Sequence, residues 1–219
     1  MKKVREACGI FKKNHPHIWV FANFIIGFPN ETYRELFDTF NYAKSLEIDY
    51  CQCSVLHLIR GTPVYEQMRS LRDERDSFGI DKMTTKTPGQ WLVAHGLTFD
   101  DIYKDVLNFK NIDLEKIPDP MEIQQFQIYF NIFVNLLGSI HLKPGGMPER
   151  AKSLTDNILK GYPMDAISWG INARAARLIG DEEGYEIAAK NYRKAVKESR
   201  FWSKFFDVYD VAKLMGIPV

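Results

Sequence analysis

The chain has 219 residues, with 29 lysines and arginines, 28 aspartates and glutamates, and three cysteines. A hydrophobic share of 45% and a charged share of 26% are typical of globular proteins and exclude the disordered and fibrous classes. The net charge of +1 provides no overall field to attract nucleic acid or an anionic membrane. Three cysteines cannot form a complete set of disulfides, which favours reduced thiols.

Signals for membrane insertion or secretion are missing from the sequence. The longest apolar run, near 127–140, is interrupted by Asn131, Asn135 and Gly138, and a membrane-spanning helix needs about 20 apolar residues. The basic first residues are not followed by the apolar core of a secretory signal. We therefore expect a soluble cytoplasmic protein.

The first residues predict a helix and a strand. Apolar residues at helical spacing predict a helix over 2–13, which ends before Pro16 because the residue before a proline is pushed out of the α region. Residues 18–26 are almost continuously apolar and rich in β-branched and aromatic types. This composition predicts a strand that is buried on both faces.

A second helix and a second strand follow. Thr32 and Glu35 have the spacing of a capping box, which predicts a helix to about Leu46. Residues 49–58 predict the next strand, and Pro63 opens a further helix, where its missing N–H costs nothing. Strand, helix and strand with short connections predict a βαβ unit with a parallel sheet and a right-handed crossover.

The pattern changes in the second half of the chain. A weaker third unit consists of a strand over Gln90–His95 and a helix through Leu107 that is capped by Thr98 or Asp100. After about Pro118 the sequence predicts only helices. These cover residues 119–142, 148–160, 164–179, 182–199 and 203–215.

Several segments resemble the radical S-adenosylmethionine (radical SAM) enzymes. Residues 22–32 read Ala-Asn-Phe-Ile-Ile-Gly-Phe-Pro-Asn-Glu-Thr and are similar to the fifth-strand motif of that family, which commonly contains Ile-Gly-Phe-Pro-Gly-Glu-Thr. Residues 39–46 resemble the helix that follows this motif, and residues 60–65 resemble the end of the sixth strand. The ordered similarity covers residues 4–68, and it is greatest to the branch whose members often carry an N-terminal cobalamin-binding domain.

The sequence departs from the family in three respects. Asn30 replaces the usual glycine, and Arg60 replaces the usual proline before Gly-Thr-Pro. The family also holds its 4Fe–4S cluster on a Cys-x-x-x-Cys-x-x-Cys loop, and Cys8, Cys51 and Cys53 do not have that spacing. The chain therefore resembles the C-terminal part of such an enzyme, without the half that binds the cluster.

This resemblance implies a fold and an activity. The expected fold class is α/β followed by all-α, with part of a radical SAM-type TIM barrel over residues 1–115 and a helical domain over residues 116–219. In the complete enzyme the reduced cluster would cleave SAM to a 5′-deoxyadenosyl radical. The chain would contribute part of the adenine pocket and substrate-covering helices, without being able to cleave SAM alone. Cobalamin is a further cofactor that the resemblance allows.

The resemblance also places the cofactor site at the carboxyl ends of two strands, where ligands of parallel α/β folds sit. The residues that match it are Ile25, Gly27, Glu31, Val55, Leu56 and His57. His57 is also a candidate acid or base, since the ordinary histidine pKa is near 6.5. The alternatives are an ordinary capped turn and a hydrogen-bonded structural histidine.

Two other groups of residues are candidates for a site. Cys51 and Cys53 point to the same face of a strand, as metal ligands or reactive thiols would, but zinc needs a second pair of ligands that the sequence does not show. Buried cysteines are the alternative. The lysines and arginine of residues 2–13 predict a solvated helix face rather than a nucleic-acid site.

The helical half suggests a function of another class. Ala188, Tyr192 and Ala195, after the turn at 180–185, resemble half of a tetratricopeptide unit. A non-catalytic protein-interaction module is therefore the alternative function. A simple amphipathic hairpin explains the same pattern.

A partial barrel would leave strand edges open, and open edges pair readily with other chains. We expect such an edge to be covered by the missing N-terminal half, by the chain's own helices, or by a second copy in a homodimer. No nucleic-acid or membrane partner is expected.

Overall fold

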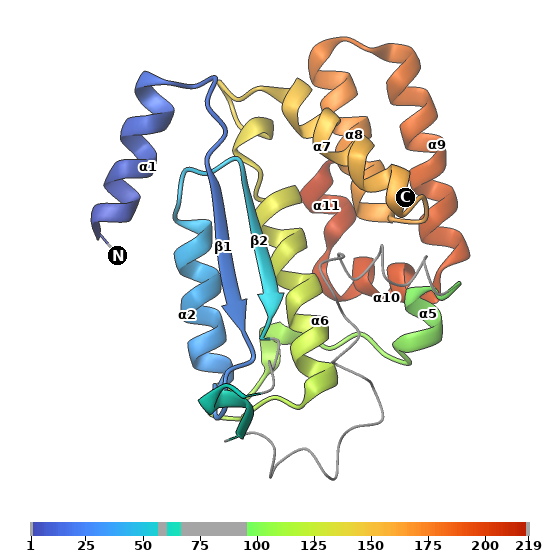
Figure 1. The fold of residues 1–219 in the computed structure, drawn as a ribbon. Coiled ribbons are helices and arrows are strands. Elements are labelled where there is room, and N and C mark those ends of the chain that lie inside the picture. Colours follow the sequence, from blue (N-terminus) through green and yellow to red (C-terminus); the bar gives the residue numbers. More distant parts are fainter. Residues whose placement is uncertain (1, 57–60, 67–95, 218–219) are drawn as a thin grey trace.

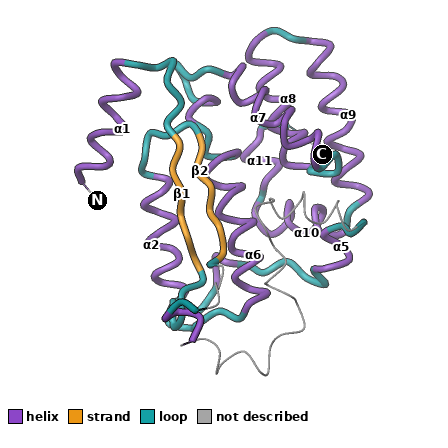
Figure 2. The backbone as a smooth tube through the Cα atoms, in the orientation of Figure 1, coloured by secondary structure: helices purple, strands orange, loops and turns teal. Residues whose placement is uncertain are grey.

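The computed structural model describes residues 2–56, 61–66 and 96–217. Helices make up most of this part of the chain, beside one small sheet (Figure 2). The elements, in chain order, are α1 (Lys2–Asn14), β1 (Phe21–Ile26), α2 (Tyr33–Lys44), β2 (Tyr50–Val55), α5 (Phe99–Ile102), the 3-10 turn η2 (Phe109–Asn111), α6 (Pro120–Asn131), the π-helix η3 (Ile132–Leu136), the 3-10 turn η4 (Ile140–Leu142), α7 (Pro148–Gly161), α8 (Ala166–Ile179), α9 (Glu182–Glu198), α10 (Arg200–Tyr209) and α11 (Val211–Met215) (Figure 1).

The predicted βαβ unit is confirmed. Strands β1 and β2 pair in parallel, in a register that runs from Phe21 opposite Tyr50 to Ile26 opposite Val55. Helix α2 connects them, and it begins at the predicted capping box, where the Thr32 amide donates to Glu35 at 2.8 Å. The described residues therefore form a mostly helical fold with a small two-stranded parallel sheet.

Only one face of this sheet is covered by described elements. The Phe24 ring contacts Tyr42 of α2 and Phe130 of α6, with ring centroids 6.3 and 5.8 Å apart. On the opposite face Phe21 and Ile25 are 51% and 50% exposed. The prediction of a strand buried on both faces is therefore wrong, because the described helices pack against one side of the sheet.

The outer edge of β2 is closed by side chains of a helix. Three amide side chains, four residues apart along α6 and η3, face the backbone of β2. Asn135 accepts from the Cys51 amide at 2.8 Å and donates to its carbonyl at 2.7 Å. Asn131 makes the equivalent pair with Cys53 at 3.2 Å, and Gln127 donates to the same carbonyl at 2.9 Å. The backbone N–H and C=O groups of Cys51 and Cys53 at this edge therefore all have hydrogen-bond partners.

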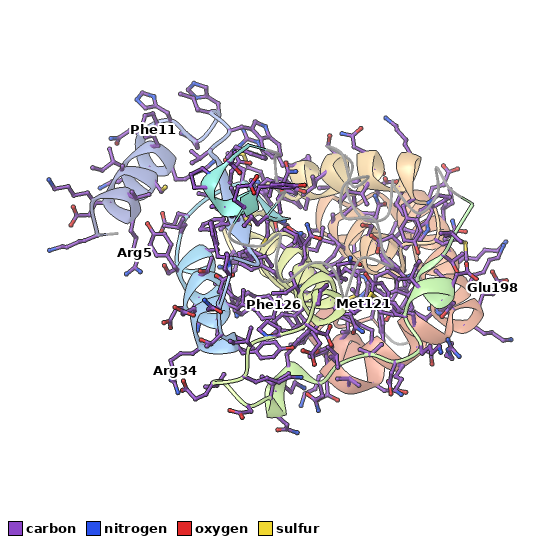
Figure 3. All side chains as sticks on the ribbon, turned by 60° about the horizontal axis from the view of Figure 1, so that its bottom comes forward. Arg5, Phe11, Arg34, Met121, Phe126 and Glu198 are labelled. Carbon is purple, nitrogen blue, oxygen red and sulfur yellow. The ribbon has the colours of Figure 1, made fainter. Side chains whose placement is uncertain are left out.

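The remaining helices form an antiparallel stack. Helices α7, α8 and α9 pack in succession, and α10 and α11 lie against them (Figure 1). The α8–α9 turn uses Gly180, with φ 77°, and the Asp181 carboxylate, which accepts from the Gly184 amide at 2.8 Å. One continuous core joins this stack to the βαβ unit, and Phe126 of α6 lies within it (Figure 3).

Three predicted helices have the wrong length. The helix predicted over 119–142 is α-helical only to Asn131 and is followed by the π-helix η3. The helix predicted over 203–215 is divided at Asp210, which has φ 54°. The predicted helix through Leu107 is only the single turn α5, which Thr98 caps and which ends at Ile102. No helix among the described residues is long and apolar enough to cross a membrane.

Candidate functional site

The carboxyl ends of β1 and β2 lie side by side. The Leu56 amide donates to the Ile26 carbonyl at 2.8 Å, so both strands end at the same level. Gly27 follows with φ 84°, a left-handed conformation that favours glycine. A Cβ atom at Gly27 would lie 3.3 Å from side-chain carbons of both Val55 and Ile123, so a side chain here would press on both neighbours.

The turn after Gly27 is built around a carboxylate. Glu31 Oε2 accepts from the amides of Gly27 at 2.6 Å and Phe28 at 3.1 Å. Burial raises the pKa of Glu31, and these two amides oppose that shift. Asn30 has φ 62° and so adopts the left-handed conformation that glycine takes most readily. Asn30 therefore fits the left-handed position of this turn without a glycine.

Five of the six sequence-predicted site residues gather at this end of the sheet. Ile25 is half-exposed on the open face, Val55 and Leu56 are partly buried, and Gly27 and Glu31 form the turn. His57 lies outside the described residues. The arrangement offers an exposed apolar side chain beside a pre-formed turn.

The open face of the sheet continues from this end with neutral side chains. Phe21, Asn23 and Ile25 alternate along β1, opposite Tyr50, Gln52 and Ser54 of β2. Neither set contains an ionisable group other than the phenol of Tyr50, whose pKa burial raises to about 12. This face can therefore contact an uncharged molecule through apolar surface, amides and hydroxyls.

The cysteines of β2 point away from the open face. Both Cys51 and Cys53 are buried on the side of the sheet that the helices cover, which confirms that they share a face. Burial raises the pKa of Cys51 to about 12 and raises that of Cys53 as well. Such thiols are poor nucleophiles. Within the described ranges no three metal-ligating side chains come together.

A cluster of charges at the opposite end of the sheet was not predicted from the sequence. Asp49 comes directly before β2, and its side chain is fully buried. Its carboxylate pairs with Lys12 of α1, lies 3.0 Å from Arg150 of α7 and accepts from the Val20 amide at 2.6 Å. Its position at the amino end of the strands separates this cluster from the candidate site and indicates a structural role.

His141 is the fourth member of this cluster. Its Nε2 lies 3.1 Å from Asp49 Oδ1, without the alignment of a hydrogen bond. Burial lowers the pKa of His141, although the Asp49 carboxylate opposes that shift. Burial also acts to raise the pKa of Asp49, but Lys12 and the Val20 amide outweigh it and hold that pKa below its usual value. The imidazole is therefore neutral at pH 7, and the carboxylate is charged.

Comparisons with known proteins add no relative. No family model matches the chain, and searches of the curated proteins and of the solved structures find no match.

Proposed function

We propose that this chain is the C-terminal portion of a radical SAM enzyme and contributes one wall of the pocket for the adenine of SAM. The observation that carries the proposal is the carboxyl end of the β1–β2 pair. There the sequence that resembles the family's fifth-strand motif forms a left-handed turn at Gly27, beside Val55 and Leu56. Helices on one face and an open second face are also what a segment of barrel wall requires.

The residues present fit the adenine part of the cofactor. Ile25 offers an exposed apolar side chain, and Gly27 gives the chain the left-handed turn at the strand end. Glu31 acts indirectly, because its carboxylate accepts from the Gly27 and Phe28 amides and so fixes the shape of the turn. SAM supplies the radical chemistry in the complete enzyme, and these residues bind and orient its adenine.

The residues do not fit the iron–sulfur cluster. The three cysteines lack the required spacing, and all of them are buried. In this proposal the missing N-terminal barrel half provides the cluster, pairs with the free edge of β1 and completes the pocket. Cobalamin would belong to a domain outside these residues, and the helices after β2 would cover the substrate.

The adenine pocket can be tested on the chain alone with 5′-deoxyadenosine. Half of a pocket should bind weakly, with a Kd of about 1 mM, so we would follow backbone amide shifts by NMR. We expect saturable shifts confined to the amides of residues 25–31 and 55–56. Gly27→Ala should abolish them, because its Cβ would crowd Val55 and Ile123.

Gly145→Ala is the matched control. Gly145 has φ 77°, so the backbone strain resembles that at Gly27, but no atom lies within 4 Å of its added Cβ. This variant should keep the shifts. Shifts spread over the helices, or none at 10 times that concentration (about 10 mM), would contradict an adenine site.

A second test is reconstitution with iron and sulfide, where formation of 5′-deoxyadenosine from SAM would show that the chain needs no other half.

An interaction module remains the second candidate, because the α8–α9 hairpin carries exposed apolar residues. Leu178 is 55% exposed and Ile187 is 52% exposed. Exposed apolar residues mark contact surfaces when they form a contiguous patch. Replacing both by lysine should leave the adenine titration unchanged, and it should abolish binding to a protein partner if this second function is correct.

A further inference from the structure

The free edge of β1 is unpaired among the described residues. Val20 and Ile26 present their carbonyls to the amides of Asp49 and Leu56 on the β2 side. Because backbone direction alternates along a strand, the residues between them at odd positions direct their N–H and C=O groups to the opposite edge. These residues are Phe21, Asn23 and Ile25, and no described strand pairs with them.

This edge lacks the features that keep strands apart. Edge strands are usually protected by charged residues, prolines or bulges. The sequence Phe21–Ile26 contains no charge and no proline, and its outward-facing side chains are exposed. A sheet of two strands is also marginal by itself, and added strands stabilise it.

We propose that, where the N-terminal half required by the proposed function is absent, a second copy of this chain occupies the edge, with the two β1 strands antiparallel about a two-fold axis at Asn23. Asn23 then lies opposite the partner's Asn23, and Phe21 lies opposite the partner's Ile25. The residues of these pairs are the ones whose backbone groups point outward, so each pair exchanges two hydrogen bonds. Aromatic residues opposite β-branched ones also stabilise antiparallel pairs.

The same register suits the covered face of the sheet. Ala22 lies opposite the partner's Phe24, a small residue against a large one, and the result is a continuous four-stranded sheet. Contact between identical patches is the commonest form of dimer. Helix α1 stands beside this edge, on the side of β1 away from β2 (Figure 1). Val4 and Phe11 of this helix are about half-exposed.

Opposite charges at residue 23 test the axis directly. The Asn23 side chain is exposed, so Asn23→Lys and Asn23→Glu should fold. Each variant alone would place like charges opposite each other and should sediment as the 25.4 kDa monomer. An equimolar mixture should restore the dimer, at twice that mass. Asn111→Lys and Asn111→Glu, at another exposed asparagine, should dimerise as the wild type does.

A cysteine at the axis gives an independent measurement. Cα atoms of such a pair are about 5.5 Å apart, within the range for a disulfide. Asn23→Cys should therefore cross-link under mild oxidation, whereas Asn111→Cys should not, and the three native thiols are buried.

Three results would overturn the proposal: a wild-type monomer at all concentrations, a dimer that the charges do not affect, or a mixture that stays monomeric. A monomer would mean that the chain covers this edge itself or reserves it for another protein. These experiments leave the adenine titration untouched, because they do not alter residues of the Gly27 turn, so the two proposals can fail separately.

Discussion

Asp49→Asn is the most informative test of how this chain is held together. The substitution preserves shape and removes one buried negative charge. The Asp49 carboxylate is shared by Lys12, Arg150 and the Val20 amide, which belong to three separate parts of the chain. Arg150 also donates to the His17 carbonyl at 2.8 Å. Loss of this charge therefore loosens α1 and α7 from the sheet together.

The expected loss of stability follows from the burial of the Asp49 ion pairs. Removing one partner of a buried ion pair typically costs 3–5 kcal/mol, because the other charge stays buried and unpaired. The Lys12 and Arg150 side chains are 12% and 17% exposed, so they can partly turn to water. We therefore expect a loss of about 3 kcal/mol. With a slope of about 2–3 kcal/mol per molar urea, the unfolding midpoint should fall by roughly 1–1.5 M.

Urea unfolding followed by circular dichroism measures this loss. Glu115→Gln is the control, since it breaks an ion pair with Arg34 in which both side chains are more than half exposed, and its midpoint should hardly move. Arg150→Met should cost less in the Asp49→Asn background than in the wild type, because the charge that it removes has already lost its partner. Equal midpoints for Asp49→Asn and Glu115→Gln would refute this account of the cluster.

Three further predictions concern buried groups. The pKa of His141 is lowered in the folded chain, so the unfolded chain protonates this histidine first as pH falls below about 6.5. The free energy of unfolding in urea titrations should therefore decline from pH 7 to 5, and His141→Gln should flatten that decline. Asn135→Leu should cost about 2–4 kcal/mol, because the Cys51 amide and carbonyl both lose a buried partner, and hydrogen exchange at Cys51 should accelerate. Cys51 and Cys53 should react with a thiol reagent only at the rate of unfolding, and prompt reaction in the native state would contradict their burial.

Local patterns in the sequence predicted the parts of the fold that depend on neighbouring residues. The capping box at Thr32 and Glu35 gave the start of α2, and β-branched runs with a short connection gave the parallel pair. The same reasoning failed for β1, because apolar composition shows that a strand is suited to burial without showing how many layers cover it. Exposure of Phe21 and Ile25 depends on which elements pack nearby.

The amide side chains of α6 and η3 show why the rest could not be predicted. In the sequence, Asn131 and Asn135 appear only as interruptions of an apolar run. In the structure they are the hydrogen-bond partners of β2, about 80 residues earlier in the chain. Their spacing of four residues places them on one helix face, and Cys51 and Cys53, two apart, present their backbone groups to one strand edge. Which amide side chain meets which strand residue is decided by the tertiary arrangement, because the two segments are far apart in the sequence. The same is true of the cations that surround Asp49. The two edges of the sheet therefore differ. Side chains of α6 and η3 close the edge at β2, whereas the edge at β1 keeps backbone N–H and C=O groups that can pair with a second strand.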